Sequence, residues 1–220
     1  MFGRISRWYD LLNHVLSLGL DIHWRRRLVQ SASVHTTRTL LDLAAGTMDV
    51  SVELTRRFPE SRVLAADFSL QMLLQGRTKI GSRPIYPLGA DALRLPLADS
   101  CLDCVTMAFG IRNVRPRQMV FQECLRVLAP GGRLCILEFG SGQKRILGGL
   151  YNLYLSRILP RIGQLISRDR QAYQYLADTI RDFPSAPALR QELIQSGFSK
   201  VWFAELSAGI VCLHVAEFLP

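Results

Sequence analysis

The chain has 220 residues, 49% of them apolar, and its 27 Lys and Arg against 18 Asp and Glu give a formal net charge of +9 at pH 7. That length and apolar content suffice for one substantial hydrophobic core, and no Pro/Gly/Ser-rich stretch divides the sequence, so we expect a single domain over residues 1–220. The longest uncharged runs fall well short of the roughly 20 apolar residues that cross a bilayer, which argues against a membrane-spanning segment.

The five cysteines are an odd number, and no cleavable apolar leader is recognisable in the sequence. A disulfide framework is therefore not expected, and a reducing, cytoplasmic setting fits best. Cys101 and Cys104 have the spacing of a metal-binding pair. Because no second pair follows at ligand spacing and Cys104 falls inside an apolar run, we expect no metal site.

Two segments hold all of the excess positive charge. Residues 1–40 contain six Arg and two Asp, residues 144–170 contain six Lys or Arg and one Asp, and the remainder is balanced. Apolar residues recur at helical spacing in both, which predicts an N-terminal helical lid over 1–40 and a helical, substrate-side insertion over 144–182. Apolar faces rimmed by Arg suit an anionic membrane surface or an amphipathic substrate, whereas a core-facing stripe with a solvated edge is the alternative.

From residue 40 onward, short apolar runs alternate with longer amphipathic ones, which is typical of a parallel sheet covered by helices. The last two apolar runs are separated only by Ser207-Ala208-Gly209, a spacing that predicts a hairpin. We therefore expect an α/β fold with a seven-stranded, mostly parallel sheet, an antiparallel C-terminal hairpin and helices on both faces. The expected strands are Leu40–Ala44, Arg62–Asp67, Ile85–Gly89, Leu102–Phe109, Arg133–Phe139, Lys200–Leu206 and Ile210–Phe218. The expected helices are Val50–Phe58, Leu70–Thr78, Arg117–Leu128, Tyr173–Arg181 and Ala188–Ser196, with a turn at Pro130-Gly131-Gly132.

The turn after the first expected strand is the first candidate for a ligand site, because ligands of open α/β sheets bind beyond the carboxyl ends of the strands. Gly46 lets the backbone approach a ligand closely, and Thr47 can donate a hydrogen bond. A tight packing turn without a ligand gives the same pattern. The turn alone is therefore a modest signal.

The second expected strand ends at Asp67, about 20 residues after the turn, where a carboxylate can accept hydrogen bonds from both ribose hydroxyls. This spacing also admits a nicotinamide dinucleotide. Against that alternative, the turn lacks the G-x-G-x-x-G spacing that a pyrophosphate requires, and Asp49 places a negative charge beside the start of the next helix.

A third acidic site follows the third expected strand. There Asp91 can accept a hydrogen bond from an adenine amine while Ala92 leaves room for the ring, although a helix cap or Asx turn is the alternative role for Asp91. Three such turns suit a cofactor with an adenosine and a sulfonium but no phosphate. They predict S-adenosylmethionine and a Rossmann-like, class I methyltransferase.

Several longer motifs are more distinctive than these turns. They are Tyr9-Asp10-Leu11-Leu12-Asn13 with Ser17-Leu18-Gly19 and Trp24-Arg25, then Phe109-Gly110-Ile111-Arg112-Asn113-Val114, and then Arg126-Val127-Leu128-Ala129-Pro130-Gly131-Gly132-Arg133 with Leu137-Glu138-Phe139. Together with Tyr173-Gln174-Tyr175-Leu176, Phe183-Pro184, Gly197-Phe198, Gly209-Ile210 and Leu213-His214, they run over nearly the whole chain. In these motifs the sequence resembles the ubiquinone/menaquinone biosynthesis C-methyltransferases.

The resemblance implies S-adenosylmethionine-dependent methylation of a ring carbon of a polyprenylated quinol, with demethylmenaquinol favoured. It places cofactor contacts at Gly46, Thr47, Asp67, Asp91, Ala92 and Ala108, and substrate-side or catalytic roles at Tyr9, Arg112 and Asn113. The sequence departs from the family's usual pattern at two of these turns. Met48 stands where a second glycine is usual, so its side chain is expected beside the methionine part of the cofactor, and Ala108 replaces a serine.

Carbon methylation requires an electron-rich ring, which a quinol provides when a hydroxyl loses its proton. Arg112 is placed to stabilise the phenolate and Asn113 to orient it, whereas a salt bridge from Arg112 to a helix carboxylate such as Glu123 is the alternative. The group that takes the proton stays open between Tyr9, Asp49 and two histidines, His14 and His23. His214, in the expected hairpin, is interpreted as structural.

The expected partners are the quinol and, peripherally, the inner face of an anionic cytoplasmic membrane. A homodimer is left open, and no nucleic acid is expected because the positive charge lies on apolar-rich segments. The alternatives are methylation of another phenolic or isoprenoid-like acceptor, and a non-catalytic scaffold with the methyltransferase fold.

Overall fold

A computed structural model of the chain describes residues 14, 17, 19–34, 37–140, 175 and 178–219. Its strands are β1 (Thr39–Leu43), β2 (Arg62–Asp67), β3 (Ile85–Gly89), β4 (Leu102–Ala108), β5 (Leu128–Phe139), β6 (Lys200–Leu206) and β7 (Val211–Glu217). The helices are α2 (Leu20–Ser31), α3 (Asp49–Arg57), α4 (Leu70–Gly76), α5 (Arg117–Val127) and α9 (Ala186–Gln195), with short 3-10 turns η1 (Arg77–Lys79) and η2 (Ile111–Asn113).

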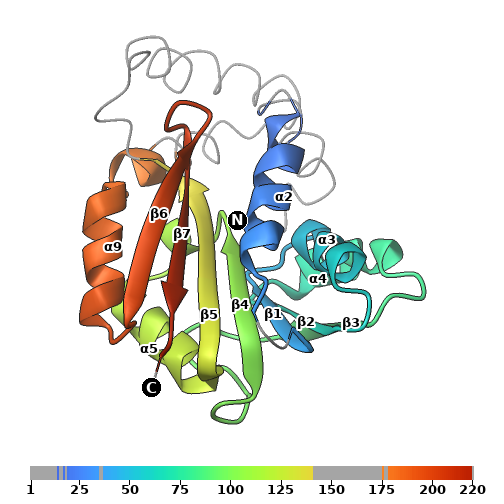
Figure 1. The fold of residues 1–220 in the computed structure, drawn as a ribbon. Helices are drawn as coiled ribbons and strands as arrows, with labels where there is room; N and C mark the ends of the chain where they lie inside the picture. The colour runs from blue at the N-terminus through green and yellow to red at the C-terminus, as the bar shows by residue number, and fades with distance from the viewer. Residues whose placement is uncertain are drawn as a thin grey trace.

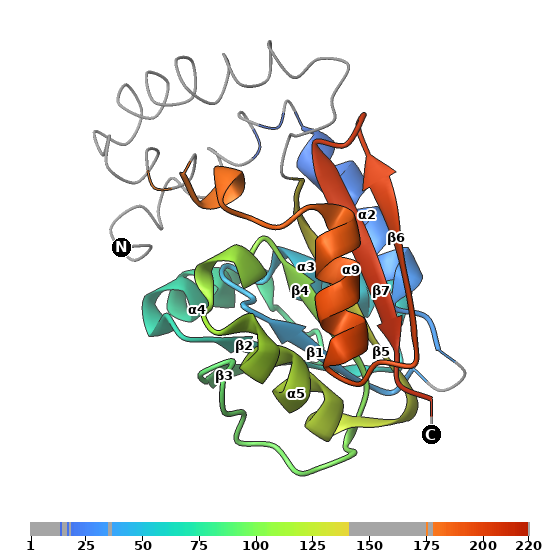
Figure 2. The same ribbon diagram turned by 90° about the vertical axis from the view of Figure 1, so that its left-hand side faces the viewer.

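The seven strands form one sheet in the order β3-β2-β1-β4-β5-β7-β6 (Figure 1). The first five are parallel, whereas β7 pairs antiparallel with both β5 and β6. Helices cover both faces, with α5 and α9 on the side that faces the viewer in Figure 2 and α2 and α3 behind the sheet. The structure therefore confirms the expected fold class, including the C-terminal hairpin.

Two hydrophobic clusters fill the space between the sheet and its helices. On one face, Phe121 and Leu189 of α5 and α9 pack over the sheet, and on the other face Trp24 and Leu28 of α2 pack with Leu54 of α3. Trp24 also donates its indole N–H to the hydroxyl of Ser207, in the loop between β6 and β7, at 2.8 Å. The hairpin thus holds the N-terminal half of α2 against the sheet.

Most element boundaries agree with the sequence to within two residues, but the start of β5 was predicted wrongly. The strand begins at Leu128 rather than Arg133, so Pro130-Gly131-Gly132 lies inside it and not in a turn before it. Gly131 has a φ of +82°, which allows an irregular segment at this point. The Gly131 N–H donates to the Phe218 carbonyl at 2.7 Å, and the Gly132 carbonyl accepts the Phe218 N–H at 2.9 Å, so the segment stays hydrogen-bonded to the chain beside it. The register between β4 and β5 shifts at this point.

The expected lid over 1–40 and the insertion over 144–182 fall largely outside the described residues, and so does most of the expected helix Tyr173–Arg181. The described part of the first segment contains α2, and β1 begins at Thr39. The division into lid and insertion therefore stays a prediction. Among the helices of the described ranges, none is both long and apolar enough to cross a membrane.

Asp42 on β1 and His214 on β7 are ionisable side chains that are buried in the sheet. Asp42 accepts a hydrogen bond from the Ser51 hydroxyl at 2.6 Å, which ties α3 to β1, and burial raises the pKa of Asp42 to about 7. His214 contacts the carbonyl of Ala186 at 3.0 Å through Nε2, and burial lowers the pKa of His214 to about 4. The interpretation of His214 as a structural residue agrees with this position in the core.

These two groups are expected to oppose one another in the pH dependence of folding. Between about pH 4 and 7 the folded chain keeps a proton on Asp42 that the unfolded chain has released, so this group stabilises the fold less as pH rises. Below about pH 6.5 the unfolded chain protonates His214 while the folded chain does not, so that contribution falls as pH falls. Each slope is at most about 1.4 kcal/mol per pH unit.

Urea denaturation from pH 4 to 7.5 separates the two contributions. Relative to wild type, Asp42→Asn should gain stability as pH rises, because it removes a carboxylate that becomes charged in the core. His214→Gln should instead gain relative stability as pH falls. A difference from wild type that does not change with pH would contradict the assignment for that residue.

Candidate active site

The candidate site lies at the carboxyl ends of the parallel strands, where the strand order reverses between β1 and β4. Here the turn after β1 packs directly against the turn after β4, because a Cβ on Gly110 would stand 2.6 Å from the Cβ of Ala44. Only glycine fits at such a separation. The two turns that the sequence marks as cofactor-side and substrate-side are therefore in contact.

The turn after β1 has an unusual backbone, with positive φ angles at Ala44 (57°), Gly46 (54°) and Met48 (66°). The conformation is held by two backbone bonds, from Ala45 N to Ala66 O at 3.0 Å and from Met48 N to Ala45 O at 2.8 Å. Left-handed backbone at alanine and methionine is strained. Two strained residues thus flank Gly46 and Thr47, which are expected to meet the cofactor.

Asp67 joins this turn to the end of β2. One carboxylate oxygen accepts the Gly46 N–H at 2.8 Å and the other accepts the Ser69 N–H at 2.7 Å. Burial raises the pKa of Asp67, and the two N–H bonds act in the opposite direction. Each carboxylate oxygen retains acceptor capacity, so Asp67 can still receive a ribose hydroxyl as the sequence predicts.

The residues after β3 have a simpler environment. Asp91 is exposed, and its Oδ1 accepts the Leu93 N–H at 2.9 Å, which is the Asx turn considered as its alternative role. Ala92 is buried in the hydrophobic cluster with α5, and Ala108 is half-buried at the end of β4. The Asx turn uses only Oδ1 of Asp91, so Oδ2 can still accept a hydrogen bond from adenine. The adenine-side roles of Asp91 and Ala92 stay predictions.

Thr47 is buried and lies beside a lysine that the sequence did not single out. Lys79 Nζ is 3.1 Å from the Thr47 hydroxyl oxygen and 2.6 Å from Asp49 Oδ1. Arg25 of α2 donates to the other oxygen of Asp49 at 2.8 Å. Both carboxylate oxygens of Asp49 are thus occupied by contacts within the chain, so the structure favours a positioning role for Asp49 over that of general base.

Arg112 and Glu138 form a buried ion pair beside the same edge. Arg112 Nη1 donates to Glu138 Oε1 at 2.6 Å and to the Phe109 carbonyl at 2.7 Å, and the guanidinium lies 5.4 Å from the Phe139 ring centre. Arg112 therefore forms a salt bridge, but the alternative partner considered for it, Glu123, is wrong, because Glu123 pairs with Arg126. Every guanidinium hydrogen bond that the described structure contains is made by Nη1, which leaves Nε and Nη2 as further donors.

Asn113 follows in the 3-10 turn η2 and is half-buried. Within the described ranges, its Oδ1 and the Nε of Arg112 are buried polar atoms without a hydrogen-bond partner. Unpaired buried polar groups are rare in native structures and call for a ligand or water. These two atoms therefore fit the expected substrate-side role of Phe109–Val114.

The other candidate proton acceptors differ in their surroundings. His14 Nδ1 is 3.1 Å from the buried Asp21 Oδ1, and about half of the His14 side chain is exposed. His23 is exposed on α2. Tyr9 lies outside the described residues, so its expected role stays a prediction.

Met48 does not occupy the position that the sequence suggested. Its side chain has no exposed surface and belongs to the cluster formed by Trp24, Leu28 and Leu54 behind the turn. The structure thus places the Met48 side chain in the core behind the turn and not on the exposed side of the turn. The expectation that Met48 lies beside the methionine part of the cofactor is therefore wrong.

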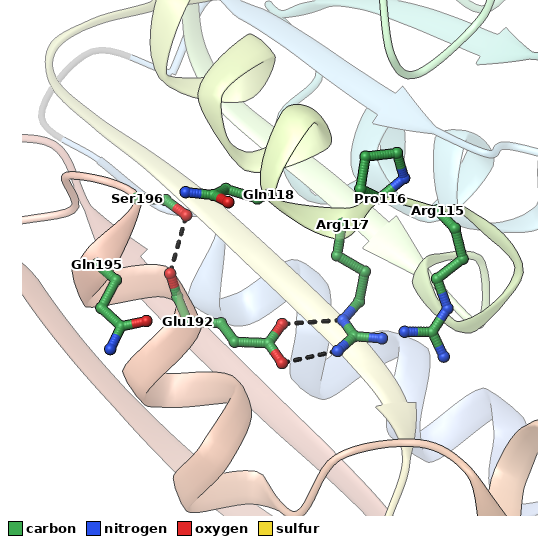
Figure 3. Close-up of a pocket in the computed structure, with 7 residues that line it drawn as sticks. All are labelled: Arg115, Pro116, Arg117, Gln118, Glu192, Gln195 and Ser196. Carbon is green, nitrogen blue, oxygen red and sulfur yellow. Dashed lines mark hydrogen bonds and ion pairs between the residues drawn. The ribbon is translucent and has the colours of Figure 1, made fainter.

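A pocket of about 560 Å³ between α5 and α9 is a separate feature (Figure 3). Arg117 and Glu192 cross it with two hydrogen bonds of 2.9 and 2.6 Å, and Arg115 and Gln195 lie at its sides. None of its lining residues belongs to the turns after β1, β2 or β3. It is therefore not the cofactor site.

Sequence reasoning missed three contributors to the candidate site. They are Lys79 beside Thr47, Glu138 beneath Arg112, and Met72, whose methyl would lie 3.5 Å from a Cβ on Gly46. Glu138 stands in the motif Leu137-Glu138-Phe139, so the resemblance contained a signal for it. Lys79 and Met72 belong to an amphipathic segment and carry no comparable signal.

Together these features define the class of protein. The strand order, the strained glycine turn and the acidic residues after β2 and β3 are those of a class I S-adenosylmethionine-dependent methyltransferase. The fold is similar to that of an S-adenosylmethionine-dependent methyltransferase from Aquifex aeolicus, with a TM-score of 0.64 and 16% identity over 89% of each chain. More particularly, the chain belongs to the ubiE/COQ5 methyltransferase family, whose model matches residues 1–217.

Relatives in this family match the chain over almost its whole length. The demethylmenaquinone methyltransferase of Thermus thermophilus is 42% identical over 99% of each chain. That of Mycobacterium tuberculosis is 41% identical over 97% of this chain and 89% of its own. The resemblance inferred from the motifs is thus confirmed, and so is S-adenosylmethionine as the cofactor.

Replacing Met48 by glycine tests its assignment to the core. Glycine relieves the positive φ but loses a buried side chain, and the second effect is larger, so we expect a net loss of about 1–3 kcal/mol of stability. The dissociation constant for S-adenosylmethionine should stay within about threefold of wild type, a difference below 1 kcal/mol. Chemical denaturation and calorimetric titration measure the two effects. A stable variant with tenfold altered affinity would instead place Met48 at the ligand.

Proposed function

We propose that the chain transfers a methyl group from S-adenosylmethionine to a ring carbon of demethylmenaquinol. The proposal is supported by the family and by the name demethylmenaquinone methyltransferase that its relatives carry. The observation that carries it is the arrangement of Arg112 and Asn113 beside the glycine turn, with buried polar atoms that await a partner.

The cofactor brings a methyl group on a cationic sulfur, and the residues of the chain bind and orient both reactants. Asp67 receives the ribose, and Asp91 and Ala92 are assigned to the adenine. The turn Gly46–Thr47 is assigned to the methionine part, and the half-buried Ala108 to the floor between the two reactants. Holding the two reactants in line, with water excluded, lowers the barrier mainly through positioning.

On the substrate side, the free N–H groups of Arg112 stabilise the phenolate that makes the ring nucleophilic, and Asn113 orients it. Glu138 fixes the guanidinium through Nη1 and compensates its charge in the buried site. We assign proton acceptance to His14, because Asp21 holds Nδ1 at 3.1 Å and so orients the ring, which leaves Nε2 as the second ring nitrogen. Tyr9 is assigned to the same side of the site.

A methyl-transfer assay with two acceptors tests the proposal. Short-chain demethylmenaquinol should be methylated on carbon, and a polyprenyl methoxy-benzoquinol should react much more slowly. A preference for the benzoquinol would show that the benzoquinol, and not the naphthoquinol, is the substrate. Methylation of neither, with S-adenosylmethionine still bound, would contradict the proposed reaction.

In the same assay, Arg112 is best removed together with its partner. Arg112→Met alone leaves the Glu138 carboxylate buried and unpaired, which should cost about 3–5 kcal/mol of stability. In Arg112→Met/Glu138→Gln the buried charge is gone, so most of that stability should return while turnover stays at least about tenfold lower, or roughly 1.4 kcal/mol in the barrier. Unchanged affinity for the cofactor is the control. Turnover close to wild type in the folded double variant would exclude the role given to Arg112.

We further propose that the chain works at an anionic membrane surface, on the cytoplasmic side. Three large apolar side chains near β2 and on α4, at the edge that carries the site, support this: Phe68, Leu70 and Leu74 are 81%, 62% and 65% exposed. Residues 68–83 contain three basic residues and no acidic one. An apolar patch with cations beside it suits insertion among anionic headgroups, where a prenylated substrate resides.

Vesicle sedimentation tests the membrane proposal. The chain should bind phosphatidylglycerol vesicles more strongly than phosphatidylcholine vesicles, and less in high salt. Leu70→Ser/Leu74→Ser should weaken binding by about tenfold through lost apolar burial. Met119→Ser, which alters a 47% exposed side chain on α5, is the matched control. Equal binding of the three proteins would exclude the patch as the contact.

A further inference from the structure

A continuous series of charged contacts joins the helix α2 to the cofactor turn. At its centre is Asp49, the first residue of α3. Asp49 Oδ2 accepts a hydrogen bond from Arg25 of α2 at 2.8 Å, and Asp49 Oδ1 accepts one from Lys79 of η1 at 2.6 Å. One carboxylate thus holds two cations that come from different elements.

The Lys79 end of this series is fixed firmly to the turn. Lys79 also lies 3.1 Å from the Thr47 hydroxyl oxygen. Three residues earlier, a Cβ on Gly76 would stand only 2.5 Å from the Thr47 carbonyl oxygen, so α4 contacts the turn backbone directly. Both the Lys79 side chain and the backbone of α4 therefore contact the turn at Thr47.

The Arg25 end is fixed to the start of α2. The second terminal nitrogen of Arg25 bonds the buried carboxylate of Asp21, which also accepts the Ser17 hydroxyl at 2.8 Å and lies 3.1 Å from His14. Residues 14 and 17 precede α2, in the segment predicted as the N-terminal lid. The series therefore reaches from the proposed proton acceptor to the cofactor turn.

A neighbouring ion pair between the same two helices provides a comparison. Arg26 of α2 and Glu53 of α3 are 3.7 Å apart, with the Arg26 side chain 62% exposed, whereas the Arg25 side chain is 19% exposed. Exposed pairs contribute little, and partly buried networks are screened less by solvent and salt. Only the Arg25 pair connects onward to Lys79 and Thr47.

We propose that Asp49 is a positioning residue that couples α2 to the cofactor turn, with Arg25 and Lys79 as its two contacts. Binding of S-adenosylmethionine at Thr47 then stabilises the position of α2, and by reciprocity a correctly placed α2 raises the affinity for the cofactor. None of these three residues needs to touch the sulfonium or the quinol. The coupling depends on cofactor binding at this turn and not on which quinol is methylated.

Calorimetric titration with S-adenosylmethionine gives the first test. Arg25→Met should weaken binding about tenfold, as expected for a coupling of moderate size, while Arg26→Met should leave it within about twofold. Arg25→Lys should restore part of the affinity, because an ammonium can still reach Asp49. Equal effects of Arg25→Met and Arg26→Met, or no effect of either, would overturn the proposal.

A double-variant comparison distinguishes coupling from simple destabilisation. Asp49→Asn should weaken binding about as much as the single changes, and adding Arg25→Met or Lys79→Met to it should have little further effect, because the shared contact is already lost. Glu53→Gln, on the same helix, is the matched control. Additive losses would mean that Arg25 and Lys79 act independently.

Hydrogen exchange measures the coupling directly. In wild type, S-adenosylmethionine should slow exchange at the amides of α2, which lies across Asp49 from the bound cofactor. In Asp49→Asn at saturating cofactor, α2 should show no such protection even where the fold is intact. Cofactor-induced protection of α2 that persists in this variant would overturn the proposal, whether or not a quinol is methylated.

Discussion

The hydrogen bond from the Gly46 amide to the Asp67 carboxylate is the interaction on which the site depends. It joins the loop after β1 to the end of β2, and the same carboxylate holds the first residues before α4 through Ser69. Because Gly46 adopts a positive φ without strain, its N–H can point toward β2 while the chain continues into α3. That geometry brings Thr47 and Asp49 within reach of Lys79. A displacement of Asp67 would therefore affect both the turn after β1 and the residues before α4.

The sequence predicted those features that depend on local periodicity and on strand ends. The alternation of apolar runs gave the sheet, and Asp67 and Asp91 follow strands whose carboxyl ends must share one edge. Partners distant in the chain were not predictable: Arg112 pairs with Glu138, 26 residues away, rather than with Glu123. The direction of Met48 depends on a single backbone angle, and adjacency to Gly46 does not reveal it. The segment at 130–132 was misread because Pro-Gly-Gly also permits an irregular strand.

The basic groups described around the site are each paired with a carboxylate of the chain itself. Arg112 and Glu138 form a neutral pair, and Asp21 and Asp49 offset Arg25 and Lys79. A site lined in this way offers no concentrated positive field for a pyrophosphate, which agrees with the absence of the dinucleotide motif from the turn. It suits a cofactor with a cationic sulfonium and an uncharged quinol. Asp67 and Asp91 add two further carboxylates at the same edge of the sheet.

The contact between Trp24 and Ser207 has a consequence for how the protein is made. The two residues are 183 positions apart, and Ser207 lies in the hairpin whose second strand, β7, is inserted between β5 and β6. During synthesis, α2 leaves the ribosome early but has no hairpin to hold it until almost the entire chain has emerged. A ribosome-bound nascent chain would thus have a glycine turn without an anchored α2. We therefore expect the site to assemble only after the C-terminal hairpin has been synthesised.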